Sequence, residues 1–276
     1  MSGTLFVVGT PIGNLGDMSR RARETLGSVD LVAAEDTRRA GRLLQTFGIR
    51  ARLVSLHEAN ERERTEQLVT AVREGAKVAV ISDGGMPGIS DPGFRLVRAC
   101  ADEGLDVRVV PGPSAAIAAL VISGLPTDRF SFEGFLPRKE GERAKRLGSL
   151  AKDRRTIVCF ESPLRVRILL RDVLALFGDR RIALARELTK LHEEVVRGRV
   201  SEVLATIADH ELKGEVVIVI EGAAPAATDD VGSFVDEAAA LSQTGVRKRD
   251  AAHEVAERHG VSANALYRAL LERTPG

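Results

Sequence analysis

The chain has 276 residues, 44% of them apolar and 29% charged, with a formal net charge of +1 at pH 7. This composition predicts a soluble globular protein with two medium domains or one large domain. No stretch approaches twenty apolar residues, so we expect neither a signal peptide nor a membrane span, and a cytoplasmic location. Cys100 and Cys159 have no CxxC or histidine partner nearby, which argues against a metal site and a disulfide.

The first 110 residues alternate between predicted strands and predicted helices. We expect strands at 4–9, 31–34, 53–56, 78–81 and 107–110, and helices at 19–29, 38–47, 60–74 and 94–103. Such β-α alternation predicts a parallel sheet with helices on both faces and its loops gathered at one edge.

Two of these strands end in loops rich in glycine and proline. Residues 78–93 read VAVISDGGMPGISDPG, a strand buried on both faces followed by a loop whose Gly84, Gly85, Gly88 and Gly93 can take positive φ. Residues 10–17, TPIGNLGD, follow the first strand. Ligands of open α/β sheets bind beyond the carboxyl ends of strands, so we expect a binding site here. Neither G-x-G-x-x-G nor a Walker motif occurs, which disfavours dinucleotides and triphosphates.

A third loop, PGPSA at 111–115, precedes a change of pattern. Ser114 is expected to start a helix at 115–122, and we place a domain boundary here. Strands then follow at 130–132, 156–160, 182–185, 194–197 and 216–220, with helices at 142–152, 166–177 and 200–209. Having fewer crossover helices, this half predicts a mixed sheet. Residues 223–230, AAPAATDD, are expected to form a linker.

The remaining residues are predicted to be helical. Helices at 250–258 and 263–271 flank the turn His259-Gly260-Val261-Ser262, in which Gly260 would end one helix and Ser262 would cap the next. This pattern fits a helix-turn-helix that contacts nucleic acid, and a plain three-helix cap explains the same residues equally well.

The three loops, in this order and near these separations, resemble the tetrapyrrole methylase superfamily, and within it the ribosomal RNA small subunit methyltransferase I branch. The resemblance continues through GFLPRK at 134–139, ESP at 161–163, ARELTKLHEE at 185–194 and the C-terminal helices. The branches that make corrins and sirohaem carry G-x-G-D-P in the central loop. This chain has Ser82-Asp83-Gly84-Gly85 instead, which counts against a tetrapyrrole substrate.

The resemblance implies an α/β fold of two tetrapyrrole methylase-type domains, 1–112 and 113–225, with S-adenosylmethionine in the cleft between them. It also implies a helical segment at 226–276, a homodimer and no metal. The expected cofactor contacts are Pro11, Asp83, Gly84, Gly85, Pro87, Ser114, Ala115, Glu161 and Leu188. Loops of this kind offer apolar atoms to an adenine and amides to a carboxylate, without placing a cation at the sulfonium. Packing alone could also explain Pro11 and Ala115, and a turn cap could explain Asp83.

By the same resemblance, the acceptor is the ribose 2′-oxygen of a decoding-region cytidine in 16S ribosomal RNA, within the small ribosomal subunit. A ribose hydroxyl is a poor nucleophile, so a base or a nearby cation would help, and we favour Asp36 and Lys190 among the charged residues at strand ends. The expected RNA contacts are Arg20, Arg21, Arg38, Arg39, Arg138 and Lys139. With nine Phe, one Tyr and no Trp, we expect recognition of phosphate and shape rather than a stacking platform.

Two other functions remain open from the sequence. A methyltransferase acting on a small tetrapyrrole would use the same loops, but would gain nothing from basic C-terminal helices. A non-catalytic protein that binds the ribosome or a nucleotide would use the loops only to hold its fold.

Overall fold

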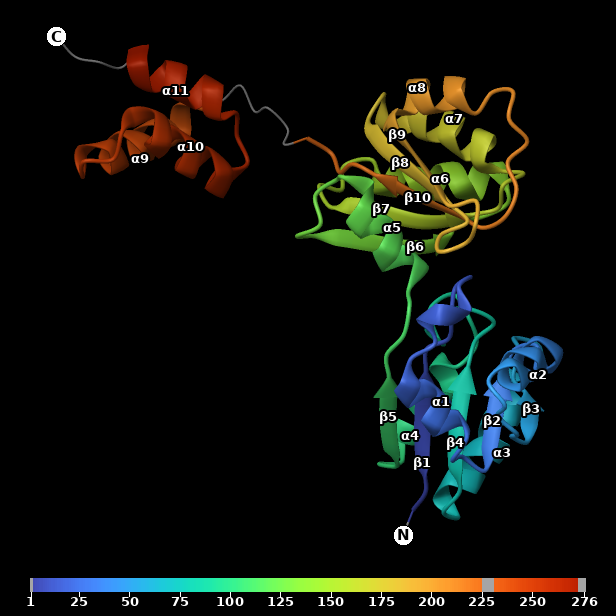
Figure 1. Ribbon diagram of the computed structural model, residues 1–276. Helices are drawn as coiled ribbons and strands as arrows, with labels where there is room; N and C mark the ends of the chain where they lie inside the picture. The colour runs from blue at the N-terminus through green and yellow to red at the C-terminus, as the bar shows by residue number, and fades with distance from the viewer. Residues whose placement is uncertain (1, 225–230, 273–276) are drawn as a thin grey trace. The chain divides into compact units, whose positions relative to one another are not determined.

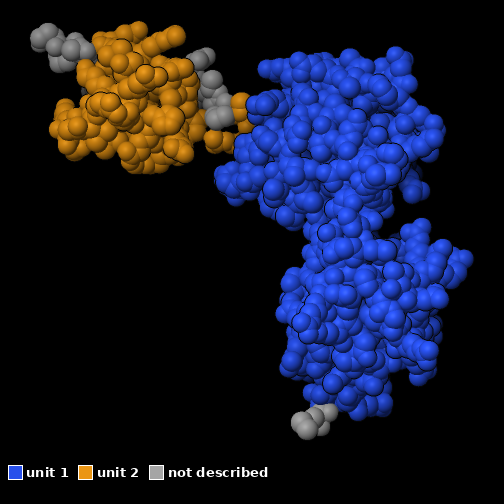
Figure 2. Space-filling view, viewed as in Figure 1, with its two compact units in different colours: residues 1–148, 156–221 blue, residues 149–155, 222–276 orange. Residues whose placement is uncertain are grey.

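The computed structural model describes residues 2–224 and 231–272 (Figure 1). The chain divides into two compact units (Figure 2): Met1–Gly148 with Thr156–Glu221, and Ser149–Arg155 with Gly222–Gly276. Both predicted sheets belong to the first unit. The boundaries predicted at 112/113 and 225/226 stay predictions, and residues 225–230 of the expected linker lie outside the described residues.

The first sheet is entirely parallel, with the strand order β3-β2-β4-β1-β5. Its strands are β1 (Thr4–Val8), β2 (Leu31–Ala34), β3 (Leu53–Ser55), β4 (Lys77–Ile81) and β5 (Asp106–Val110). A short 3-10 turn, η1 (Leu15–Asp17), and the helices α1 (Arg20–Leu26), α2 (Thr37–Thr46), α3 (Glu61–Arg73) and α4 (Phe94–Asp102) complete this half.

Strand β4 lies at the centre of this sheet and is buried on both faces. Val78 and Val80 pack in the core with α3 and α4, whereas Ala79 and Ile81 pack in the core with α1 and α2. This alternation follows from the two-residue period of a strand between two helical layers. The predicted parallel sheet with helices on both faces is confirmed.

The second sheet is mixed, in the order β6-β7-β10-β8-β9. Only β6 (Phe130–Phe135) and β7 (Thr156–Glu161) pair in parallel; β8 (Arg181–Arg186), β9 (Glu194–Arg199) and β10 (Val216–Ile220) add antiparallel pairs. Helix α5 (Ala115–Ser123) packs on β7, β8 and β10. Helices α6 (Glu140–Leu150), α7 (Val166–Phe177) and α8 (Val200–Thr206) complete this half. The mixed sheet predicted from the sequence is confirmed.

The C-terminal unit holds α9 (Gly232–Gln243), α10 (Lys248–His259) and α11 (Ala263–Glu272), which share a core of their own around Val235, Val255 and Leu266. Gly260 ends α10 at φ +70°, and the Ala265 N–H donates to Ser262 Oγ at 3.2 Å, so both predicted caps are confirmed. Contact with nucleic acid stays a prediction.

None of the described helices is both long and apolar enough to cross a bilayer. Residues 2–224 and 231–272 contain no group of three or more His, Cys, Asp or Glu side chains that could hold a metal ion.

Candidate cofactor and substrate pocket

The three glycine- and proline-rich loops converge. The Thr10 N–H donates to the Gly85 carbonyl at 2.9 Å, and the Gly85 N–H donates back to the Thr10 carbonyl at 3.1 Å. A Cβ on Gly9 would lie only 2.6 Å from Gly112 Cα, so the first and third loops touch at a point where no side chain fits. The first loop, at 10–17, thus forms one surface with the loops at 82–93 and 111–115.

These loops line a cavity of about 620 Å³, which also takes residues from the second sheet. The predicted site residues that line it are Pro11, Arg39, Asp83, Gly84, Gly85, Ser114, Ala115, Glu161 and Lys190. Two of the predicted cofactor contacts lie elsewhere, since Pro87 is buried and Leu188 belongs to the core of the second sheet. For those two positions the geometry supports packing, while the remaining cofactor contacts stay predictions.

The structure corrects the expected conformation of Gly84 and the expected capping role of Ser114. Gly85, Gly88 and Gly93 have positive φ, but Gly84 does not; its Cβ position lies 3.3 Å from the Pro11 carbonyl oxygen, so close approach explains it better. Ser114 precedes α5 as expected, yet its side chain makes no capping hydrogen bond. Ser114 lines the cavity.

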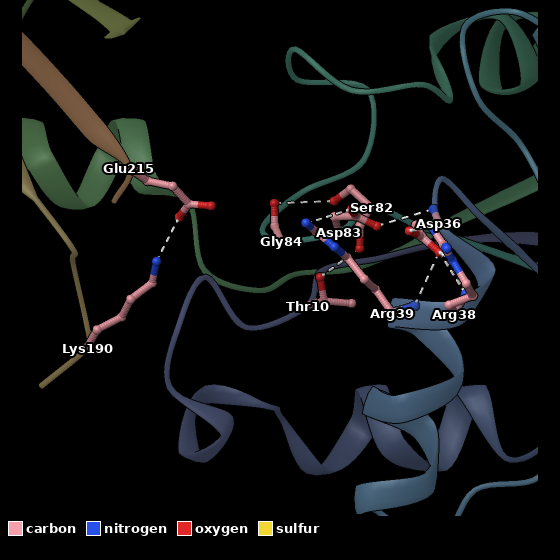
Figure 3. Close-up of polar contacts among 9 residues, drawn as sticks. All are labelled: Thr10, Asp36, Arg38, Arg39, Ser82, Asp83, Gly84, Lys190 and Glu215. Atoms are coloured by element: carbon pink, nitrogen blue, oxygen red, sulfur yellow. Dashed lines mark hydrogen bonds and ion pairs between the residues drawn. The ribbon is translucent and has the colours of Figure 1, made fainter. Parts of the chain in front are cut away.

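Asp36 has a structural role in this arrangement. Its Oδ1 accepts from the Arg38 N–H at 2.8 Å and caps α2, while its Oδ2 pairs with the Arg38 guanidinium at 3.0 Å (Figure 3). The Arg38 hydrogen bonds hold the pKa of Asp36 at about 2, and Asp36 does not line the cavity. A carboxylate with such a low pKa is a weak proton acceptor, so the geometry does not support Asp36 as the base.

Asp83 ties the central loop to the start of α2. Its Oδ2 pairs with Arg39 Nη1 at 3.0 Å, and its Oδ1 accepts from the Asp36 N–H at 3.3 Å. Figure 3 shows this cluster, with Lys190 and Glu215 paired apart from it. The carboxylate therefore positions two loops as well as lining the cavity.

Lys190 reaches the cavity from the second sheet. Its Nζ lies 2.8 Å from Glu187 Oε1. It also lies 3.2 Å from Glu215 Oε2 (Figure 3). A Cβ on Gly13 would lie 2.5 Å from Lys190 Cγ, so the lysine stem crosses the first loop. Partial burial disfavours the ammonium, but the Glu187 hydrogen bond and the Glu215 charge outweigh it and raise the pKa of Lys190. Lys190 is therefore a cation at neutral pH and can stabilise a developing oxyanion.

Asp91 is a residue that the sequence did not single out. It lines the cavity, and burial, together with the negative charges of Glu35, Asp83 and Glu215, raises its pKa to about 6 despite a hydrogen bond from Ser82. The preceding Ser90 has φ +61°, a conformation that is strained for a residue with a side chain. A carboxyl that titrates near neutrality in a cavity has the properties of a general base. Its sequence context, SDPG, reads as an ordinary turn.

Glu161 is buried at the end of β7, and one of its carboxylate oxygens is held by two partners. Its Oε1 lies 2.5 Å from Arg165 Nη2 and accepts the Ser162 N–H at 2.7 Å. It therefore enters the cavity wall as a fixed, paired carboxylate.

The expected RNA contacts are mostly engaged in surface ion pairs. Arg20 pairs with Glu24, Arg38 with Asp36, and Lys139 with Glu142. Of the six, only Arg39 lines the cavity. Exposed pairs of this kind are weak, so the cations remain available to phosphate, and their role stays a prediction.

The cavity fits S-adenosylmethionine in chemistry. Apolar side chains such as Ile12, Leu43 and Val217 suit an adenine, and the main chain of the glycine loops can meet its polar edges. Four acidic residues line the same cavity, Asp83, Asp91, Glu161 and Glu215, which suits a sulfonium and an ammonium group.

Comparison with known proteins decides the family. The profile of the family described as Tetrapyrrole (Corrin/Porphyrin) Methylases matches residues 4–204. The chain belongs to this family. A protein of Escherichia coli O157:H7 named "Ribosomal RNA small subunit methyltransferase I" is 46% identical over 274 residues, covering 98% of this chain and 96% of its own. A protein of the same name from Mycobacterium tuberculosis is 47% identical over 275 residues, covering 98% and 95%.

Solved structures share the fold at low identity. The methyltransferase CobJ is similar with a TM-score of 0.60 and 21% identity, over 81% of this chain and 95% of that chain. Uroporphyrin-III-C-methyltransferase from Thermus thermophilus has a TM-score of 0.55 and 22% identity, over 80% and 93%. These likenesses concern the fold alone. The predicted family and α/β fold are confirmed, and so is the prediction that the chain is a methyltransferase that uses S-adenosylmethionine.

Proposed function

We propose that the chain methylates the ribose 2′-hydroxyl of a decoding-region cytidine in 16S ribosomal RNA. The observation that carries this proposal is the cavity formed by the three loops, with Lys190 and Asp91 on its wall. The name shared by relatives 46% and 47% identical over nearly the whole chain supports ribosomal RNA as the acceptor. The departure of Ser82–Gly85 from the motif of the corrin makers supports the same choice.

The proposed division of labour follows from the cavity wall. Bound S-adenosylmethionine supplies an electrophilic methyl group. The backbone around Pro11, Gly84 and Ala115 holds the cofactor, and holding the acceptor oxygen in line with the methyl carbon supplies much of the acceleration. Asp91, ionised above about pH 6, takes the hydroxyl proton, and the Lys190 ammonium stabilises the negative charge that develops on the oxygen.

The partners and the setting belong to the same proposal. The chain would act in the cytoplasm on RNA within the small ribosomal subunit, as a homodimer. Its scattered exposed arginines, of which Arg21 and Arg138 are examples, would neutralise phosphate, so binding should weaken steeply with salt.

One experiment tests the proposal directly. Small subunits from a strain that lacks the modification are incubated with the protein and with methyl-labelled S-adenosylmethionine, and the RNA is digested to nucleosides for mass spectrometry. The proposal predicts label in 2′-O-methylcytidine and none in small subunits that already carry the methyl group. Label in another nucleoside, or label in uroporphyrinogen and none in RNA, would overturn it.

A further inference from the structure

Three phenylalanines gather beside the cavity, although the chain contains few aromatic residues. The Phe160 ring centroid lies 5.0 Å from that of Phe132 and 5.5 Å from that of Phe135. Phe132 and Phe135 are three residues apart on β6 and would face opposite sides of a regular strand. The pairing of β6 with β7 is irregular between them, and Gly134 has φ +60°, so a bulge turns both rings towards Phe160.

The outermost of these rings is open to solvent. Phe135 is 56% exposed and lines the cavity together with Phe160. Ile89, 48% exposed, adds apolar surface to the same lining. An exposed aromatic ring at a cavity, packed against a second ring, can act as a stacking surface.

The surroundings of Phe135 match a nucleotide. A Cβ on Gly134 would lie 3.1 Å from Ser90 Oγ, so the bulge abuts the residue that precedes Asp91. Arg138, three residues beyond Phe135, is exposed. The cavity lining therefore offers an aromatic face and a carboxyl that can accept a proton, and the exposed Arg138 follows three residues after Phe135 as a guanidinium that can meet a phosphate.

We propose that Phe135 stacks on the base of the target nucleotide while Arg138 contacts its backbone phosphate. This inference rests on the proposed function and names the subsite that would receive the acceptor. The competing occupant of the ring is the adenine of the cofactor. The RNA base is favoured because Phe135 is largely open to solvent and is followed by an exposed cation, which suits a polyanion arriving from outside. Stacking is tolerant of base identity, so the ring secures a splayed nucleotide rather than reading its sequence.

Removing the Phe135 ring distinguishes between the RNA base and the cofactor adenine as the group that stacks on it. Phe135→Ala should raise KM for small subunits by about 5- to 150-fold, the range of one lost base stack. Its dissociation constant for S-adenosylmethionine, measured by calorimetry, should stay within about twofold of wild type. Phe135→Tyr, which keeps the ring, should restore KM. Phe130→Ala at the other end of β6 is the matched control, because Phe130 is 37% exposed and does not line the cavity.

The absence of tryptophan from the sequence allows a binding assay that is independent of turnover. Phe135→Trp introduces a single indole, and its fluorescence should be quenched by small-subunit RNA and change little with S-adenosylhomocysteine. Phe130→Trp should respond to neither. Quenching of the Phe135→Trp indole by the cofactor product alone, or weaker cofactor binding by Phe135→Ala with KM for RNA unchanged, would overturn the assignment.

The outcomes distinguish this inference from the proposed function. Wild-type protein that methylates RNA, together with a Phe135→Ala variant of unchanged KM, would remove the stacking subsite and leave the function standing. Quenching of Phe135→Trp by small-subunit RNA, with no methylation by wild-type protein of small subunits that lack the modification, would support the subsite and remove the function.

Discussion

Replacing Asp91 by asparagine should stabilise the fold at neutral pH while it abolishes methyl transfer. The pKa of Asp91 is raised from 3.8 to about 6, first by burial and then by Glu35, Asp83 and Glu215. At about 1.4 kcal/mol per pKa unit, ionising this group in the folded state costs at most about 3 kcal/mol. Screening by solvent at a half-buried carboxylate reduces this to about 1–2 kcal/mol. Asparagine carries no such cost, so Asp91→Asn should melt about 2–8 °C above wild type at pH 8.

The sign of the pH dependence makes this prediction specific. Because the folded pKa is the higher one, wild type loses stability as pH rises from about 4 to about 6 and carries the full cost above that window. The advantage of Asp91→Asn should therefore vanish near pH 4, as followed by scanning calorimetry across pH. Asp179→Asn is the control of opposite sign, since hydrogen bonds from Ser201 lower the pKa of Asp179, which does not line the cavity, and the variant should lose stability at pH 8. An Asp91→Asn variant that is less stable than wild type at pH 8, or that is active, would refute the reasoning.

Three further predictions concern the wall of the cavity and the C-terminal helices. Lys190→Ala should lower kcat by about 100-fold with unchanged cofactor affinity by calorimetry, and near-normal turnover would exclude an electrostatic role. Gly214→Ala should impair turnover, because its Cβ would lie 2.0 Å from Glu187 Oε1 and displace the partner of Lys190. Gly48→Ala is the matched control, because Gly48 also has a positive φ but no atom lies within 4 Å of its Cβ position. This variant should lose about 1 kcal/mol of stability in denaturant titrations and keep full activity. Deleting 225–276 should leave cofactor affinity within about twofold, since every residue that lines the cavity lies between positions 11 and 217.

Local patterns predicted most of the fold. The alternation of strands and helices up to Val110, and the burial of β4 on both faces, follow from hydrophobic period and from turn residues. The convergence of the three loops also followed, because parallel strands end at one edge of their sheet. Family resemblance added residues of the second sheet, such as Glu161, which no local pattern could place beside the loops of the first sheet.

The site residues depend on contacts that the sequence does not encode locally. Asp36 stands at a strand end as a base would, but the Arg38 guanidinium and the α2 N-terminus engage its carboxylate. Asp91 gains its raised pKa from burial and from charges up to more than 100 residues away, which no motif reports. A low aromatic content led us to expect no stacking platform, but composition carries no information on where the few rings lie. The bulge at Gly134 brings Phe135 to the cavity.

The central claim is that the three loops hold a methyl donor in one cavity. A crystal structure of the protein with S-adenosylhomocysteine tests it most directly. The account predicts ligand density against the backbone of Gly84 and Ala115, with its sulfur facing the space between Asp91 and Lys190. Density for the ligand at any other place on the chain, with this cavity filled only by solvent, would contradict it.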